Sequence, residues 1–147
     1  MKNINYKKKK IFIIIFFLIL FNFTNLFSEN SFFKDGKSLF DKKDYKKAKF
    51  KFEQDIVFNP KSEKAYLYLA KIFKVEKKSE LEESNLNTVI LLNPENEEAI
   101  YRLVKLNILK SNFSEAEDLL KKFNNICKNL CSKNTELKND LNNSLKK

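Results

Sequence analysis

The sequence predicts an all-α protein, an α-solenoid of about three stacked helix pairs with a capping helix at its end. Asn59-Pro60 and Asn93-Pro94 each follow an apolar helical pattern, and they stand 34 residues apart, a spacing typical of a repeated helix pair. The 147 residues include one glycine and two prolines, too few for the turns of a sheet. Good helix formers such as Lys, Glu and Leu dominate the repeats.

Residues 1–28 have the pattern of a secretory signal peptide. Four lysines, Lys7 to Lys10, precede an unbroken apolar run from Ile11 to Phe21, and the small Ser28 stands before Glu29. The run is shorter than the ~20 apolar residues of a membrane helix, so we expect cleavage after Ser28. The alternative is an uncleaved signal anchor whose lysines stay in the cytoplasm. Either way, we expect the repeats outside the cytoplasmic membrane, in the periplasm or cell envelope.

Residues 29–62 contain the clearest helix pair. Gly36 and Ala48 are small at the two positions where the helices of the pair are expected to cross most closely, because only a minimal side chain lets two backbones approach. A break near Lys43-Asp44 separates the two helices, and Pro60 follows the second. The large residues of the pattern are Phe32, Leu39, Phe40, Tyr45 and Phe52.

Residues 63–96 and 97–130 repeat this register with departures. The matching positions are Tyr66, Leu69, Ala70, Phe73, Leu86, Val89 and Pro94 in the second unit, and Ile100, Leu103, Phe113, Ala116, Leu120 and Phe123 in the third. Glu82 stands where the first unit has Ala48. In the third unit Val104 replaces the small residue, Asn107 falls at a position that is usually large, and Lys128 takes the place of the proline.

The pattern over residues 30 to 128 resembles the tetratricopeptide-repeat family. In that family an aromatic, a small and another large residue mark the first helix, and Ala-x-x-x-Phe marks the second. The resemblance is strong in the first unit and weaker in the next two. It implies a solenoid whose curved surface holds a partner, and therefore binding rather than catalysis. The alternative is an ordinary bundle of amphipathic helices with a chance spacing of its prolines.

Residues 131–147 are predicted to form the capping helix and a tail. Leu137, Leu141 and Leu145 recur every four residues and make a narrow apolar stripe on a helix. A repeat array needs such an end piece, because its last unit would otherwise expose the face that a neighbour covers. The alternative is a frayed tail rich in lysine and asparagine.

Cys127 and Cys131 lie four residues apart at the end of the third unit. Export to an oxidising compartment makes a disulfide between them conceivable. Within one continuous helix the two side chains would share a face, but the bridge geometry would be poor. The other interpretation is two small buried apolar residues. A zinc site is not expected, because two thiols without histidine do not fill a zinc shell.

No catalytic pattern is present in the sequence. The absence of histidine excludes Ser-His-Asp and Cys-His arrangements, and a single glycine excludes a glycine-rich phosphate loop. The acidic pairs Glu82-Glu83 and Glu97-Glu98 are interpreted as solvated residues near helix starts. We therefore expect no enzyme, no cofactor, no metal and no small-molecule substrate.

The family resemblance implies a concave surface lined by the first helix of each unit. Three lysines recur there at intervals of 34 residues, beside a row of apolar residues at a neighbouring position. The predicted groove consists of Phe33, Lys37, Phe40, Leu67, Lys71, Lys74, Tyr101 and Lys105. A basic, partly apolar groove suits an extended or helical peptide of acidic character. Because lysine is frequent throughout the chain, a scatter of solvated lysines is the alternative.

Three functions are compatible with these patterns. The leading one is a protein-interaction scaffold or adaptor in the bacterial cell envelope. The second is a lysine-rich binder of anionic surfaces, either lipid headgroups or nucleic acid, and the third is a structural subunit of an oligomer. Nucleic acid is not the expected partner, because the net charge of +10 falls to +5 (24 basic and 19 acidic side chains) without residues 1–28. An uncleaved N-terminal segment would also bring the protein into contact with the membrane.

Overall fold

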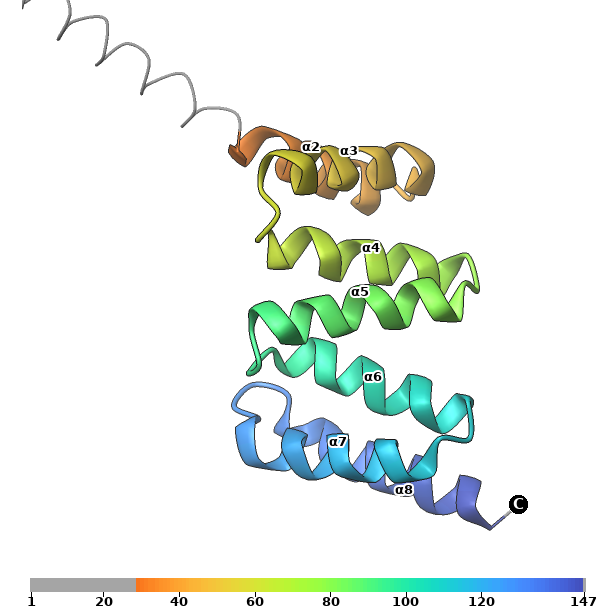
Figure 1. Cartoon of the computed structure of the whole chain (residues 1–147). Coiled ribbons are helices and arrows are strands. Elements are labelled where there is room, and N and C mark those ends of the chain that lie inside the picture. The colour runs from red at the N-terminus through yellow and green to blue at the C-terminus, as the bar shows by residue number, and fades with distance from the viewer. Residues whose placement is uncertain (1–28, 147) are drawn as a thin grey trace, which may run out of the picture.

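Seven α-helices follow one another as stacked hairpins in the computed structural model, which describes residues 29–146 (Figure 1). The predicted export segment, residues 1–28, lies outside the described residues. The elements are α2 (Glu29–Asp41), α3 (Tyr45–Phe58), α4 (Glu63–Val75), α5 (Ser79–Leu92), α6 (Glu97–Leu109), α7 (Phe113–Ile126), the short 3-10 helix η1 (Cys131–Lys133) and α8 (Asn134–Leu145). Between Glu29 and Lys146 no residue lies in a strand.

The helices pair as the repeat predicts. Helix α2 packs on α3, α4 on α5 and α6 on α7, while α3 against α4 and α5 against α6 join one pair to the next. Helix α8 lies on α6 and α7 at the end of the stack. The structure therefore confirms an all-α solenoid of three helix pairs closed by a capping helix.

The turn inside each pair has the same backbone conformation. Its central residue is Lys43, Lys77 or Ser111, each 34 residues from the next, and each has a left-handed φ of 61°, 57° or 60°. In the second pair the N–H of Lys78 donates to the carbonyl of Phe73, and the N–H of Lys77 donates to that of Lys74. The turns of the first and third pairs have the equivalent bonds, so α2, α4 and α6 all end in the same left-handed cap.

The small residues lie at the closest helix crossings, as the sequence predicts. Gly36 is buried, and a Cβ atom there would lie 2.7 Å from Cε1 of Phe52, so only glycine fits against this ring. Ala48, Ala70 and Ala116 are completely buried at related positions in the other helices. Because these side chains are minimal, the helices approach closely enough to enclose the larger apolar residues.

Three apolar clusters form the core, one at each junction of the stack. The first contains Ala48, Phe52, Ala65, Leu69, Ile72 and Phe73; the second contains Leu67, Ala70, Leu86, Val89, Ala99, Leu103 and Leu106; and the third contains Ile100, Val104, Ile108, Ala116, Leu120, Phe123, Leu137 and Leu141. Leu137 and Leu141 come from α8, which explains why the capping helix is ordered rather than frayed. Leu145, the last leucine of the predicted stripe, is exposed.

The outer face of α2 differs from the equivalent faces of α4 and α6. Ser31, Asp35 and Ser38 are exposed there. The equivalent residues in the next two units are buried against the preceding pair, and they are Ala65, Leu69, Ile72, Ala99, Leu103 and Leu106. A polar outer face is what the end of a repeat array requires.

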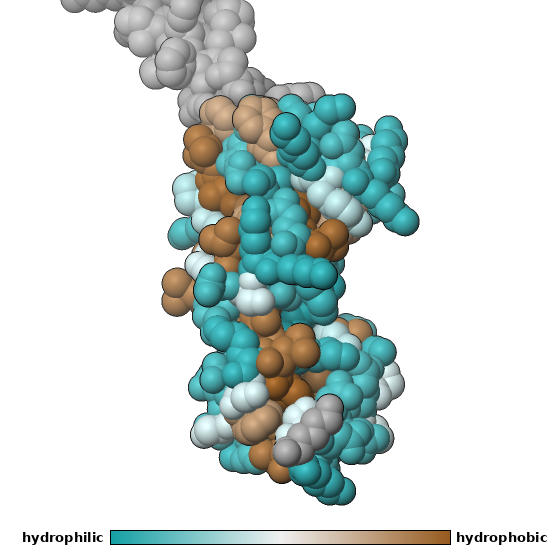
Figure 2. Space-filling view, turned by 90° about the vertical axis from the view of Figure 1, so that its right-hand side faces the viewer, coloured by the Kyte–Doolittle hydropathy of each residue, from teal (hydrophilic) through white to brown (hydrophobic). Residues whose placement is uncertain are grey.

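The edge where each pair turns also exposes apolar residues. Figure 2 looks onto this edge and shows apolar surface in both its upper and its lower half, among hydrophilic side chains. Val75 and Leu109, the last residues of α4 and α6, are both exposed. No helix within residues 29–146 combines the length and apolar character that crossing a membrane requires.

Candidate partner-binding face

An aromatic cluster occupies the first half of the predicted groove. The ring of Tyr68 stands edge-on to Phe33, at 5.5 Å between centroids, and to Phe40, at 5.1 Å. Phe52 closes the cluster from the core side, 5.1 Å from Tyr68. Phe33, Phe40 and Tyr68 are only half-buried, so this cluster offers aromatic surface to solvent. The sequence analysis identified Phe33 and Phe40 but missed Tyr68, which joins them.

Lys71 lies beside this cluster but is not a free cation. Its Nζ atom is 4.5 Å from the centroid of Tyr68 and 3.0 Å from Oε1 of Glu98, and its side chain is 17% exposed. Arg102 reaches the same oxygen at 2.8 Å. Burial opposes ionisation of Glu98, but the hydrogen bonds from Lys71 and Arg102 hold its pKa below the usual value. Glu98 therefore neutralises Lys71 from the next unit along the stack.

Lys105 is neutralised in the same way by the capping helix. Its Nζ atom lies 2.8 Å from Oε1 of Glu136 and 3.4 Å from Oδ2 of Asp140, and the hydroxyl of Tyr101 donates to Glu136 at 2.9 Å. Hydrogen bonds from Lys105, Lys133 and Tyr101 lower the pKa of Glu136 to about 2. Acidic side chains of the protein itself therefore occupy the last part of the predicted groove.

The first unit has no acid in the equivalent place. The position 34 residues before Glu98 is occupied by Lys64, so the second unit has a lysine where the third unit has an acid. Lys37 pairs only with Asp41 of its own helix, at 2.9 Å on an exposed surface. Lys34, Lys64 and Lys74 are also exposed. Exposed lysines therefore lie at the start of the stack, near the aromatic cluster, together with the exposed Asp35 and Asp41 of α2.

Leu67 lies apart from the other predicted groove residues. Its side chain is 8% exposed and belongs to the apolar cluster between the second and third units, so it supports the face rather than lining it. We call the surface of α2, α4 and α6 around Phe33, Lys37, Phe40, Lys64, Tyr68, Lys71, Lys74, Tyr101 and Lys105 the first-helix face. Its role in binding stays a prediction.

A hollow of about 480 Å³ opens at the start of this face. Its lining includes Phe33 of α2, Lys61 and Lys64 around the start of α4, and the carboxylate of Asp55. Asp55 is 2% exposed and accepts a hydrogen bond from the hydroxyl of Ser62 at 2.5 Å. The buried acid is therefore satisfied within the protein, and Lys61, Lys64 and the half-buried Glu63 are the other charged side chains that line the hollow.

The acidic pair Glu97-Glu98 is not a solvated helix start, contrary to the expectation from sequence. The carboxylate of Glu97 accepts the backbone N–H groups of Asn129 and Leu130, the latter at 2.7 Å. Glu63, 34 residues earlier, accepts from the side-chain amide of Asn93 at 3.1 Å. Each glutamate is the first residue of the first helix in its unit. Its carboxylate accepts hydrogen bonds from the loop that ends the same unit. The 34-residue spacing of Glu63 and Glu97 is the sequence signal from which this shared role could have been predicted.

Glu82 also departs from the expectation of a solvated acid. It is 5% exposed and occupies the position of Ala48 and Ala116 in the other units. Burial raises its pKa, while the charges of Lys74 and Arg102 act in the opposite direction. Among the described residues, the structure gives the Glu82 carboxylate no hydrogen-bond or ion-pair partner. A buried carboxyl group in this environment destabilises the fold when it is ionised.

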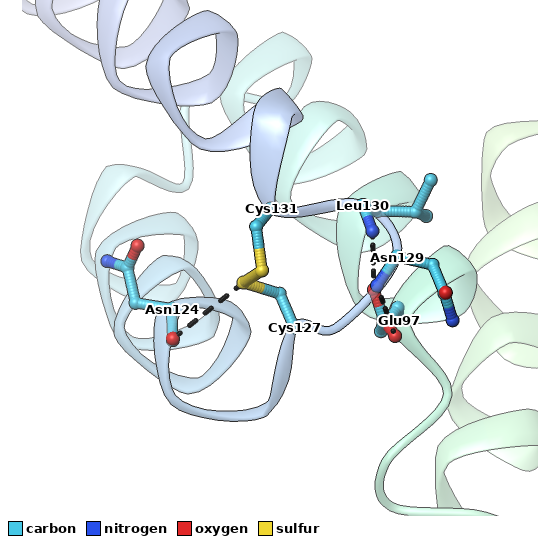
Figure 3. The surroundings of a disulfide bond; sticks show 6 residues. All are labelled: Glu97, Asn124, Cys127, Asn129, Leu130 and Cys131. Carbon is cyan, nitrogen blue, oxygen red and sulfur yellow. Dashed lines mark hydrogen bonds between the residues drawn. A yellow bond between two sulfur atoms is a disulfide. The ribbon is translucent and has the colours of Figure 1, made fainter.

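A disulfide joins Cys127 and Cys131 (Figure 3). Helix α7 ends at Ile126, and Cys131 begins η1, so the two cysteines do not share one continuous helix. Their Cα atoms are 5.1 Å apart, within the range that a disulfide spans. Of the two interpretations of this pair, the structure contains the disulfide. It closes the loop that leads into the capping helix.

No family model and no curated protein matches the sequence. Solved structures do match. The first TPR domain of Spaghetti (RPAP3), bound to the HSP90 peptide SRMEEVD, has a TM-score of 0.71 and 18% identity over 81% of this chain and 94% of that chain. The TPR2B domain of yeast Sti1, in complex with pHsp70, has a TM-score of 0.70 and 18% identity over 80% and 96%.

A bacterial structure is similar to the same degree. The Yersinia enterocolitica type III secretion chaperone SycD, in complex with a peptide of the translocator YopD, has a TM-score of 0.69 and 13% identity over 78% of this chain and 89% of that chain. The fold is TPR-like. The resemblance read from the repeat pattern is therefore confirmed at the level of the fold. In the part of this TPR-like solenoid that the structure describes, no group of three or more acidic or cysteine side chains is placed to hold a metal.

Proposed function

We propose that the protein is a non-enzymatic scaffold or adaptor that binds a partner protein or peptide on its first-helix face. The observation that carries the proposal is the aromatic cluster of Phe33, Phe40 and Tyr68, which stays half-exposed beside exposed lysines. Several structures of the same fold hold peptides, among them the RPAP3 domain and SycD. A half-exposed aromatic surface next to positive charge is a common feature of peptide recognition.

The distribution of charge indicates where the partner docks. Lys71 and Lys105 are paired with Glu98 and Glu136, whereas Lys37 pairs with the exposed Asp41 of its own helix and Lys64 is exposed. An acidic segment of a partner gains the most binding free energy where it does not have to displace a carboxylate of the protein itself. We infer that the acidic part of the partner lies over α2 and the start of α4, with an apolar side chain against the aromatic cluster.

We further propose that this scaffold works in the bacterial cell envelope after export directed by residues 1–28. The disulfide supports this location, because such bonds persist in oxidising compartments. Mass measurement of the protein from membrane and periplasmic fractions is expected to find a chain that begins near Glu29. Recovery of only the intact chain from Met1 in the membrane would contradict cleavage after Ser28.

Site-specific photocrosslinking in cells tests the binding face. A photoreactive residue at Phe40 or Lys64 is expected to capture one discrete partner. The same residue at Asn87 or Glu117, which are exposed on the second helices, is the matched control and is expected to capture none. Equal capture from both sets of positions would reject the first-helix face as the binding surface.

Charge reversal then distinguishes a groove from a general basic surface. Lys34, Lys37 and Lys64 changed together to Glu are expected to abolish capture, because they form the basic end of the face. The control changes three exposed lysines elsewhere, Lys46, Lys77 and Lys138, with the same change in net charge. Equal weakening by both triple variants, with a steep loss on adding salt, would instead identify a binder of anionic surfaces.

A further inference from the structure

The disulfide lies in a loop that is held at three points. Cys127 and Leu130 pack against the apolar cluster of the third unit, and the backbone N–H groups of Asn129 and Leu130 donate to Glu97 (Figure 3). The disulfide adds the third point by joining the end of α7 to the start of η1. The loop is therefore held by one covalent bond together with apolar contacts and hydrogen bonds.

The two sulfur atoms belong to residues in different environments. Cys127 is half-buried against the core, whereas Cys131 is exposed. Thiol–disulfide exchange requires the attacking thiolate to reach one particular sulfur, so access selects the site of attack. Cys131 is the more exposed residue of the pair.

The loop leads directly into the capping helix. Helix α8 begins at Asn134, immediately after η1, and its contacts are with α6 and α7. Leu137 and Leu141 bury its apolar stripe, and Glu136 binds Lys105 and Tyr101 on the first-helix face. Whatever loosens the start of α8 therefore affects both the end of the core and the last part of that face.

We propose that Cys131 is a thiol–disulfide exchange site at which a dithiol oxidoreductase opens the loop and loosens the capping helix. A thiolate of the oxidoreductase attacks Sγ of Cys131, the bond to Cys127 breaks, and Cys127 leaves as a thiolate that takes up a proton. The second thiol of the oxidoreductase then attacks the mixed disulfide, which releases Cys131 as a thiol. The oxidoreductase dithiol loses two electrons and two protons and becomes a disulfide, while the loop gains them.

The reverse reaction closes the loop through the same sulfur. A Cys131 thiolate attacks the disulfide of an oxidised donor, and Cys127 resolves the mixed disulfide. The exchange site does not depend on the partner-binding function proposed above. Its consequence for the partner does rest on that function, because loosening α8 would free Lys105 and Tyr101 at the end of the first-helix face.

Trapping with glutathione tests the site of exchange. The reduced full chain is mixed briefly with oxidised glutathione, quenched with acid and digested, and the adduct is located by mass spectrometry. We expect the adduct on Cys131 in at least about tenfold excess over Cys127, because access favours the exposed sulfur. Equal labelling, or an excess on Cys127, would overturn the assignment.

Hydrogen exchange tests the effect on α8. The amides of Leu137 to Leu145 are expected to exchange at least about tenfold faster in the reduced than in the oxidised full chain, while those of α4 keep their rate. The Cys127→Ser/Cys131→Ser variant should match the reduced chain under oxidising conditions. Equal α8 exchange in the oxidised and reduced protein would show that the bond does not hold the helix. Neither measurement involves the binding partner, so a failure here is distinct from a failure of the proposed function.

Discussion

Replacing Gly36 with alanine tests the closest helix contact in the solenoid. In most helices this change is favourable, because alanine exceeds glycine in helix propensity by about 0.8–1.0 kcal/mol. Here the added Cβ would lie 2.7 Å from Cε1 and 2.9 Å from Cδ1 of Phe52, well inside ordinary van der Waals contact. The two effects have opposite signs, and the packing of Phe52 decides between them.

The ring of Phe52 has no room to move away. It is completely buried, with the rings of Phe33 and Tyr68 at centroid distances of 5.7 Å and 5.1 Å. Overpacking a core of this kind costs typically about 1–3 kcal/mol, which exceeds the gain in helix propensity. We therefore expect Gly36→Ala to destabilise the protein by about 1 kcal/mol, equivalent to a fall in melting temperature of about 4 °C.

Urea unfolding followed by far-UV circular dichroism measures this difference. Ser38→Ala is the matched control, because it changes helix propensity at an exposed position of the same helix and is expected to stabilise by about 0.5 kcal/mol. In a Phe52→Leu background the clash is removed, so Gly36→Ala should become favourable there. If Gly36→Ala stabilised the parent protein as the control does, the close approach of α2 to Phe52 would be refuted.

Four further changes test other parts of the structure. Phe52→Ala should lose about 3–5 kcal/mol through the cavity it leaves, and an unchanged denaturation midpoint would contradict its place in the core. Lys77→Gly should stabilise by about 1 kcal/mol, because glycine adopts the left-handed turn without strain; a loss in thermal melting would contradict the turn conformation. Glu82→Ala should raise stability most at neutral pH. The folded state raises the pKa of Glu82, so the parent loses stability as pH rises above 4.5 through the folded value, and melting curves of the variant should lack this slope. Glu136→Gln should loosen α8 at neutral pH in hydrogen exchange. Because the folded pKa of Glu136 is about 2, the parent loses this contact as pH falls from 4.5 to about 2, and the variant should show no such acid-dependent step.

The fold was predictable because its determinants repeat at a fixed spacing. Gly36, Ala48 and Phe52 occupy the packed positions that the family pattern assigns to them, and the two prolines mark the ends of real helices. Periodic small and apolar residues report a packing geometry that every unit shares, so one sequence is enough to recognise it. The left-handed turns were not predicted, since lysine and serine stand where glycine is the usual signal.

The positions of the candidate site were predictable, but their electrostatic state was not. Repeat register placed Lys37, Lys71 and Lys105 correctly on the first helices, since they recur every 34 residues. Lys71 and Lys105 pair with residues that lie 27 or more positions away, Glu98 and Glu136, whereas Lys37 pairs with Asp41 of its own helix. Only the three-dimensional stacking of units brings these side chains together.

The same stacking explains why one end of the face is suited to an external partner. In a solenoid each unit stacks on the next, so a lysine on a first helix can pair with an acid of the following unit. The next first helix provides Glu98 to Lys71, and α8 provides Glu136 to Lys105. At the position equivalent to Glu98, the first helix after α2 has Lys64. We therefore expect the acidic segment of a partner to bind over α2, where, among the described residues, Lys37 pairs only with the exposed Asp41 of its own helix.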